Sequence, residues 1–225
     1  MLETILQHPI VSVQNKNYQT YGGNQMLSDD KMIRRCGCGI VAAADLFIYL
    51  HRYKFAMHKV STLEALPDNP VPLEMYNALL KDLNRHYFPL IPKFGINNVV
   101  LCAGINLFFL RRGVSLRARC VLGGGKRWEL AREQLSRDIP VIFTVGQNVP
   151  FVWQKHRLPL YVRLPDGTMR PGGSVKAHFM TMTGIDDEWI RVSSWGRMFY
   201  VNQSEFEAYT KAHSANALCN IIYIR

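Results

Sequence analysis

Residues 34–50 read RRCGCGIVAAADLFIYL, and this stretch decides the fold expected for the first half of the chain. Its glycines and cysteines are typical of a loop that enters a helix, and the small residues Ala42, Ala43 and Ala44 follow at once. We therefore predict a helix over residues 38–53 whose small side chains pack closely against a sheet. A cysteine at the start of a helix lies near free N–H groups and the positive end of the helix dipole, and both favour the thiolate.

The patterns on either side of this helix predict an α+β fold. Apolar residues at helical spacing come first, and short apolar or alternating runs bounded by turn residues follow. The further predicted helices cover residues 74–86, 97–112, 126–137 and 202–212. The predicted strands cover residues 115–122, 140–145, 158–164, 168 onward, 178–185, 189–193, 198–201 and 218–224. Helices followed by a run of strands indicate an antiparallel sheet in a single domain over residues 1–225.

An insertion at about residues 147–176 precedes the strand that begins at His178. Pro165, Asp166 and Gly167 predict the turn of a hairpin within it. The insertion also carries the aromatic residue Trp153. We expect a hairpin flap near the cleft that helps to select the substrate, or else an extension that covers the edge of the sheet.

Composition limits the classes of protein that this chain can belong to. Apolar residues make up 48% of the 225 residues and charged residues 20%, which is ordinary for a globular protein. No run approaches the roughly 18 apolar residues that span a bilayer, and no secretory signal is seen. We therefore predict a cytoplasmic protein without membrane contact. The five cysteines, an odd number, then indicate reduced thiols.

The net charge of +10 comes from scattered basic residues. No Lys/Arg-rich block with interleaved aromatic residues is present, so a nucleic-acid surface is only weakly indicated. Steering of an acidic substrate accounts for the charge equally well. Cys36 and Cys38 lack the second cysteine pair of a structural zinc site, and we predict neither a metal nor a cofactor.

His178 opens the run HFMTMTG at residues 178–184, which predicts a strand with the histidine at its rim. A neutral imidazole there can take the proton of a thiol that a helix brings beside it. The second ring nitrogen needs an acceptor that fixes the orientation of the ring. Ser193, on the next strand, is well placed to supply it.

These segments together resemble the papain-like cysteine peptidase superfamily, and most closely its bacterial branch of bacteriocin-leader-processing (double-glycine) peptidases. The CGIVAA run at residues 38–43 resembles the Cys-Gly head of the nucleophile helix in that branch. The HFMTMTG run resembles its histidine strand, and the SSWG run at residues 193–196 resembles the Asn-Ser-Trp-Gly element of papain. The resemblance implies a helical half whose nucleophile helix packs on a C-terminal antiparallel sheet.

The resemblance also implies a catalytic set of Cys38, His178, Ser193 and Gln25. Ser193 stands where papain has the asparagine that orients the histidine, and Asp186 or Asp187 are alternatives for that role. The family places a glutamine that holds the oxyanion shortly before the cysteine, whereas Gln25 lies farther ahead of Cys38 in this chain. Cys36 competes with Cys38 for the role of nucleophile, and we favour Cys38 because the residues after it continue the family pattern.

The leading functional hypothesis is a cysteine hydrolase or acyltransferase that acts on a peptide or amide through a thioester. Cys38 attacks, His178 moves the proton, and the Cys38 amide with Gln25 holds the oxyanion. A papain-like domain that has lost catalysis and serves as a binding module is the second hypothesis. A basic nucleic-acid-associated protein is the third.

Overall fold

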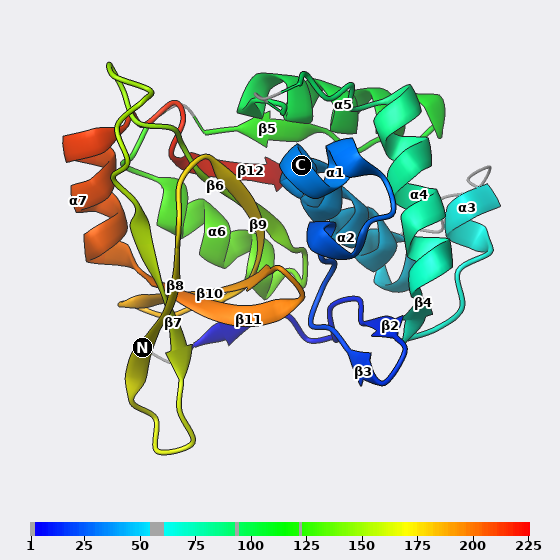
Figure 1. Cartoon of the computed structure of the whole chain (residues 1–225), viewed down its shortest axis with the longest axis horizontal. Helices are drawn as coiled ribbons and strands as arrows, with labels where there is room; N and C mark the ends of the chain where they lie inside the picture. The colour runs from blue at the N-terminus through cyan, green and yellow to red at the C-terminus, as the bar shows by residue number, and fades with distance from the viewer. Residues whose placement is uncertain (1–2, 55–60, 93–94, 122) are drawn as a thin grey trace.

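Most helices lie in the first half of the chain and most strands in the second, as the order of the sequence patterns predicts (Figure 1). This computed structural model describes residues 3–54, 61–92, 95–121 and 123–225. The predicted α+β class is confirmed. The helices are η1 (Gln25–Leu27), α1 (Lys31–Cys36), α2 (Cys38–Tyr53), α3 (Ser61–Glu64), α4 (Leu73–His86), α5 (Asn98–Arg111), α6 (Arg127–Ser136) and α7 (Gln203–His213). The strands are β1 (Thr4–Ile5), β2 (Val13–Asn15), β3 (Tyr18–Gln19), β4 (Val71–Pro72), β5 (Ala118–Cys120), β6 (Val141–Val145), β7 (Leu158–Arg163), β8 (Met169–Val175), β9 (His178–Ile185), β10 (Trp189–Ser194), β11 (Arg197–Asn202) and β12 (Asn220–Ile224).

Helix α2 is the buried centre of the helical half. Every residue from Gly39 to Leu50 is buried, because the helix is apolar on all sides and packs between other helices and the sheet. Its bounds agree with the predicted helix at residues 38–53. Neither α2 nor any other helix of the described residues is long and apolar enough to cross a membrane.

Gly37 joins α1 directly to α2. Its N–H donates to the carbonyl of Ile33 at 2.8 Å, and its own carbonyl accepts from Val41 at 3.0 Å. A Cβ atom at this position would lie 2.5 Å from the Ile33 carbonyl oxygen. Glycine therefore allows the chain to leave one helix and begin the next within a single residue.

Helix α1 is an element that the sequence prediction missed. The Asp30 carboxylate caps it by accepting hydrogen bonds from the backbone N–H groups of Met32 and Ile33. The helix is only six residues long, so its apolar periodicity is too short to be recognised. Its effect on the site is large, because it turns the chain between Gln25 and Cys38 back on itself.

A nine-stranded sheet forms the second half, in the order β5-β12-β6-β9-β10-β11-β7-β8, with β1 against β9. All of its described pairs are antiparallel. The register sets Val145 of β6 opposite His178, and Ser193 of β10 opposite Thr181. His178 and the end of β10 therefore meet at one rim of the sheet, beside the start of α2. A second sheet has the order β3-β2-β4.

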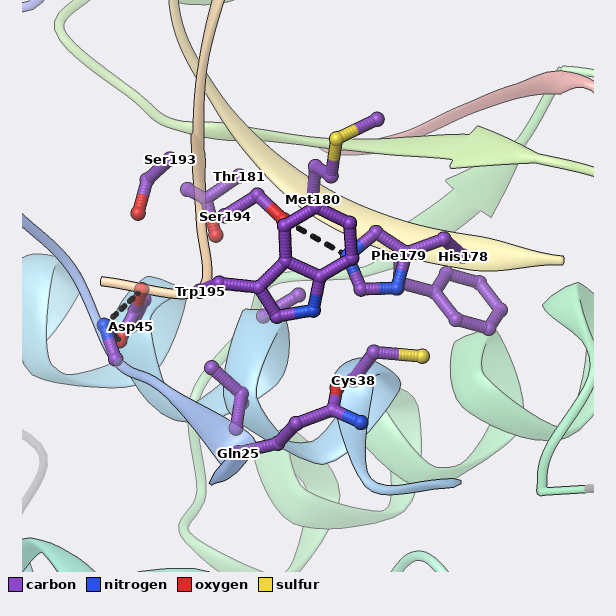
Figure 2. A pocket seen from close by; sticks show the side chains of 13 residues that line it. Gln25, Cys38, Asp45, His178, Phe179, Met180, Thr181, Ser193, Ser194 and Trp195 are labelled. Atoms are coloured by element: carbon purple, nitrogen blue, oxygen red, sulfur yellow. Dashed lines mark hydrogen bonds between the residues drawn. The ribbon is translucent and has the colours of Figure 1, made fainter. Parts of the chain in front are cut away.

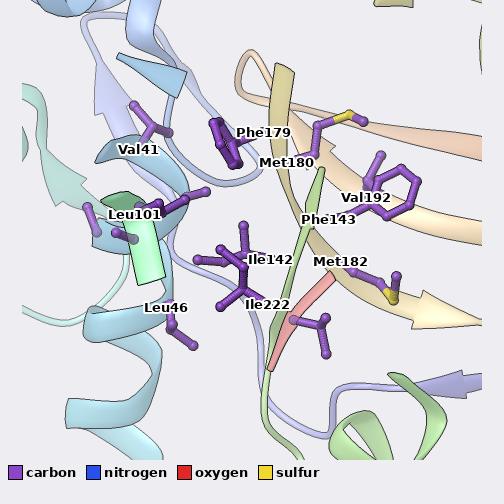
Figure 3. Close-up of a cluster of buried hydrophobic side chains, with 14 of the residues drawn as sticks. Val41, Leu46, Leu101, Ile142, Phe143, Phe179, Met180, Met182, Val192 and Ile222 are labelled. Carbon is purple, nitrogen blue, oxygen red and sulfur yellow. The ribbon is translucent and has the colours of Figure 1, made fainter. Parts of the chain in front are cut away.

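Helices cover both faces of the large sheet. Successive residues of a strand point to opposite faces, and Figure 3 shows Ile142 of β6 on the side of Leu46 from α2. The ring of Phe143 lies on the other face, 6.2 Å from Trp128 of α6 and 4.8 Å from Phe206 of α7. A strand buried on both faces is apolar throughout, which explains the continuous apolar run of β6.

The insertion at residues 147–176 contains the predicted hairpin, formed by β7 and β8. Strand β7 pairs with β11, so the hairpin continues the large sheet to its edge, and its turn projects away from α2 (Figure 1). The loop that precedes the hairpin begins beside the rim, at the end of β6, where the N–H of Ala177 donates to the carbonyl of Gly146. Trp153 is exposed on this loop. Selection of the substrate by the hairpin stays a prediction.

Candidate active site

One small pocket lies where the start of α2, the rim of β9 and β10, and the segment before α1 meet (Figure 2). All four residues singled out from the sequence line it: Gln25, Cys38, His178 and Ser193. Three further residues matter for its chemistry: Asp45, Ser194 and Trp195. Residues far apart in the chain therefore form one site.

Cys38 is the first residue of α2, and it lies beneath the imidazole of His178 (Figure 2). Its place at the helix start predicts a lowered pKa. Burial instead raises the pKa of the Cys38 thiol, and the backbone N–H groups of Phe179 and Gly39 oppose this shift only in part. The expected lowering of the pKa by the helix start is therefore not found, because burial of the thiol acts in the opposite direction.

His178 is the first residue of β9, and its Nε2 lies 2.8 Å from the Oγ of Ser194. The opposite edge of the ring, which carries Nδ1, faces Cys38 (Figure 2). The indole of Trp195 stacks on the imidazole with the ring centroids 4.8 Å apart. Burial lowers the pKa of His178 to about 4. The imidazole is thus held by a hydroxyl on one edge, covered by an indole, and neutral at pH 7.

The hydroxyl that meets His178 belongs to Ser194, which corrects the expected role of Ser193. The Ser193 hydroxyl donates instead to the backbone carbonyl of Tyr21 at 2.8 Å. The two serines are neighbours in a strand, so their side chains point in different directions. The likeness to the papain Asn-Ser-Trp-Gly element is therefore displaced by one residue at the position that contacts the histidine.

Asp186 and Asp187 do not stand in for the orienting residue. They follow the far end of β9, about 25 Å along an eight-residue strand from His178. Asp186 Oδ1 accepts the backbone N–H of Trp189 and so closes a turn. Asp187 forms an ion pair with Arg132.

Gln25 begins η1 and is almost fully buried beside Cys38 (Figure 2). Its Nε2 donates to the backbone carbonyl of Arg34 at 3.0 Å. Helix α1 returns the chain so that the glutamine, which precedes that helix in the sequence, reaches the start of α2, which follows it. A side-chain amide carries two N–H donors, so one of them can serve a ligand while the other keeps this contact.

Cys36 is the last residue of α1, and its thiol turns back onto that helix. Its Sγ lies 3.3 Å from the carbonyl oxygen of Met32. Burial raises the pKa of Cys36 as well. Because its hydrogen bond is internal to α1, Cys36 does not share the partners of Cys38. All five cysteines are free thiols in the structure.

Asp45 is the residue of this site that sequence reasoning missed. It lies two turns after Cys38 on the same helix face, and only 1% of it is exposed. Its carboxylate accepts the N–H of Gly23 at 3.0 and 3.1 Å and the hydroxyl of Tyr76 at 2.7 Å. Burial raises the pKa of Asp45 to about 7. The available signal was the single carboxylate within an apolar helix, on the face that carries Cys38.

Comparison with known proteins identifies no relative. No family model matches the chain, and neither the curated proteins nor the solved structures include a significant match. The resemblance to papain-like peptidases therefore rests on the short sequence motifs alone. Within the described part of the chain, no three His, Cys, Asp or Glu side chains gather as the ligands of a metal would.

Proposed function

We propose that this protein is a papain-like cysteine hydrolase or acyltransferase that acts on peptide or amide bonds. One observation carries the proposal: Cys38, at a helix start, lies at the Nδ1 edge of His178, while the Nε2 edge is held by Ser194. A nucleophile, a base and a group that orients the base are the three parts of nucleophilic acyl transfer.

The reaction starts from a neutral pair, because burial raises the pKa of Cys38 and lowers that of His178 to about 4. His178 takes the thiol proton as the sulfur attacks the substrate carbonyl, and Ser194 Oγ accepts from Nε2–H of the imidazolium. The imidazolium then protonates the departing amine as the C–N bond breaks and the thioester remains. Water or a second amine attacks the thioester and releases Cys38.

The negative oxygen of the tetrahedral intermediate needs donors on the side of the helix start. The backbone N–H of Cys38 is one of the unpaired donors of α2. The free N–H of the Gln25 amide is the second. Donors fixed in place before the reaction stabilise such an oxyanion strongly.

The size and position of the pocket support a peptide or amide substrate. Its interior volume is about 10 Å³, room for a single water-sized group. No small molecule is enclosed in such a space, so the scissile carbonyl approaches Cys38 from the surface. A chain that lies across the surface, as a peptide does, meets this requirement.

Acyl trapping tests the proposal. The protein is mixed with p-nitrophenyl acetate and with short peptide thioesters, and each cysteine is read by mass spectrometry. We expect acylation of Cys38 that His178→Ala slows by about 100-fold or more, because a general base contributes on that order. Acylation of Cys38 at an equal rate in His178→Ala would contradict the proposal.

Cys36→Ser is the matched control, because Cys36 is close to Cys38 in the chain and its thiol faces α1. It should leave acylation of Cys38 unchanged. Each cysteine must be read separately, because the neighbouring Cys120 lowers the pKa of Cys102 below that of an ordinary thiol. Total thiol reactivity therefore reports Cys102 as well as the site.

A binding module without catalysis is the second candidate, favoured by the shift of both Cys38 and His178 toward their neutral forms. The same experiment separates the two. If no reagent acylates Cys38 while peptides still bind to wild type and to Cys38→Ser with equal affinity, the pocket binds peptides and does not cleave them.

A further inference from the structure

Gly22 and Gly23 form a turn beside the pocket, and neither glycine takes part in the proposed reaction. Gly22 has φ +74°, in the left-handed region that favours glycine. A Cβ atom on Gly22 would lie 1.9 Å from Ser193 Oγ and 2.9 Å from Asp45 Oδ2. A Cβ atom on Gly23 would lie 1.9 Å from the Tyr76 hydroxyl oxygen. Three polar side chains therefore close around two glycines.

Asp45 contacts this turn from the nucleophile helix. Its two carboxylate oxygens receive the Gly23 N–H, and Oδ1 also receives the Tyr76 hydroxyl of α4. Asp45 lies on the helix face that carries Cys38, so the contact joins the turn to the element that holds the nucleophile. Figure 2 shows Asp45 at the opposite end of the pocket from Cys38.

The turn leads directly into Gln25. The carbonyl of Gly23 accepts the N–H of Gly196 at 3.1 Å, and the side chain of Asn24 caps η1 by accepting from Met26 N–H at 2.9 Å. Gln25 is the first residue of that short helix. A shift of Gly23 therefore moves Gln25 relative to Cys38, because only Asn24 separates Gly23 from Gln25.

We propose that Asp45 is a positioning residue, whose carboxylate holds the Gly22–Gly23 turn against α2 so that the Gln25 amide faces the carbonyl under attack at Cys38. The inference rests on the proposed function and deepens it. Asp45 does not touch the substrate. It acts as a hydrogen-bond acceptor on the scaffold of the oxyanion donor.

Two nearly isosteric variants separate the acceptor from the volume it fills. Asp45→Leu removes both acceptors. Asp45→Asn keeps Oδ1, which receives both the Gly23 N–H and the Tyr76 hydroxyl, and replaces Oδ2, 3.0 Å from the Gly23 nitrogen, with an NH2 group. Asp138→Asn is the control for lost stability, because this buried Asp holds His8 and Lys54 and does not line the pocket.

Amide hydrogen exchange of residues 20–27 is the first measurement, and it needs no substrate. We expect exchange at Gly23 to rise by about 10-fold or more in Asp45→Leu, to rise less in Asp45→Asn, and to stay near wild type in Asp138→Asn. Unchanged exchange in Asp45→Leu overturns the inference. Faster exchange in Asp45→Asn to the level of Asp45→Leu also overturns it, because Asn retains the acceptor.

Turnover of the substrate found by acyl trapping is the second measurement. Asp45→Leu should lower kcat by up to about 100-fold with little change in KM, as loss of an oxyanion donor does. The double variant with Gln25→Ala should be no slower than Gln25→Ala alone. If the losses of kcat in Asp45→Leu and Gln25→Ala multiply in the double variant, the positioning role is wrong.

The two proposals fail in different ways. If Cys38 of wild type is never acylated, the proposed function is wrong, and the positioning role that depends on it is wrong as well. The exchange data still report whether Asp45 holds the turn. If wild type is acylated but exchange and the double variant show no link to Asp45, this inference falls alone.

Discussion

At the scale of single residues, two adjacent serines form hydrogen bonds with different partners. The Ser194 hydroxyl meets His178 Nε2 at 2.8 Å, and the Ser193 hydroxyl meets the Tyr21 carbonyl at the same distance. A hydrogen bond to a charged group contributes about 1.5–3 kcal/mol, which corresponds to about 10- to 100-fold in rate. The orientation of His178 therefore depends on Ser194.

We expect Ser194→Ala to slow acylation of Cys38 by about 10- to 100-fold, because the imidazolium loses its acceptor. Ser193→Ala, the neighbouring control, should change the rate only a few-fold. Stopped-flow acylation of the two variants measures this. A larger loss in Ser193→Ala than in Ser194→Ala would restore Ser193 as the orienting residue.

At the scale of elements, the site depends on how closely α2 follows α1. Gly37 is both the last cap of α1 and the first cap of α2. A Cβ atom at this position would lie 2.5 Å from the Ile33 carbonyl oxygen. That contact is with backbone, which yields less readily than a flexible side chain. The close succession of the two helices both directs Cys38 into the pocket and returns Gln25 to it.

We expect Gly37→Ala to lower the free energy of unfolding by about 1–3 kcal/mol, the usual cost of overpacking. For a chain of this size the melting temperature then falls by about 2–4 °C per kcal/mol. Gly125→Ala is the matched control, because a Cβ atom there has nothing within 4 Å. Calorimetry of both variants measures the difference, and an equal Tm for the two would contradict the contact.

At the scale of the whole molecule, two buried groups of the pocket oppose each other in their effect on stability with pH. The pKa of Asp45 is raised from 3.8 to about 7, so the folded state holds the extra proton and stability falls as pH rises between these values. The pKa of His178 is lowered from 6.5 to about 4, so stability rises with pH across that range. At 1.36 kcal/mol per unit, the two effects are on the order of 4 and 3 kcal/mol.

Asp45 and His178 change the free energy of unfolding with pH in opposite directions. Together they should therefore change the stability of wild type little between pH 4 and 6.5. Asp45→Asn should instead gain stability over the same range, since only the His178 slope remains. Urea unfolding at intervals from pH 4 to 7.5 measures this. A variant profile parallel to that of wild type would show that Asp45 does not titrate in this range.

Much of the fold follows from local patterns, as α2 and β6 show. The apolar run after Cys38 and the apolar stretch at residues 140–145 each predict their element, and the bounds agree within a residue. Helix α1 escaped prediction because six residues hold too little periodicity to be recognised. The pocket also includes Asp45, whose role depends on a turn that precedes both α1 and α2 in the chain.

The sequence by itself determined the α+β class and the main helices and strands, because these depend on periodicity and on residue type within short segments. It also indicated Cys38 and His178 as candidates for one site, and both line the same pocket. Only the tertiary structure decided that Ser194 meets the histidine, that Gln25 reaches Cys38 from the far side of α1, and that Asp45 is buried under Gly23. It also decided the direction of the Cys38 pKa shift. The physical reason is that strand facing, burial and contacts between distant segments arise when the elements pack.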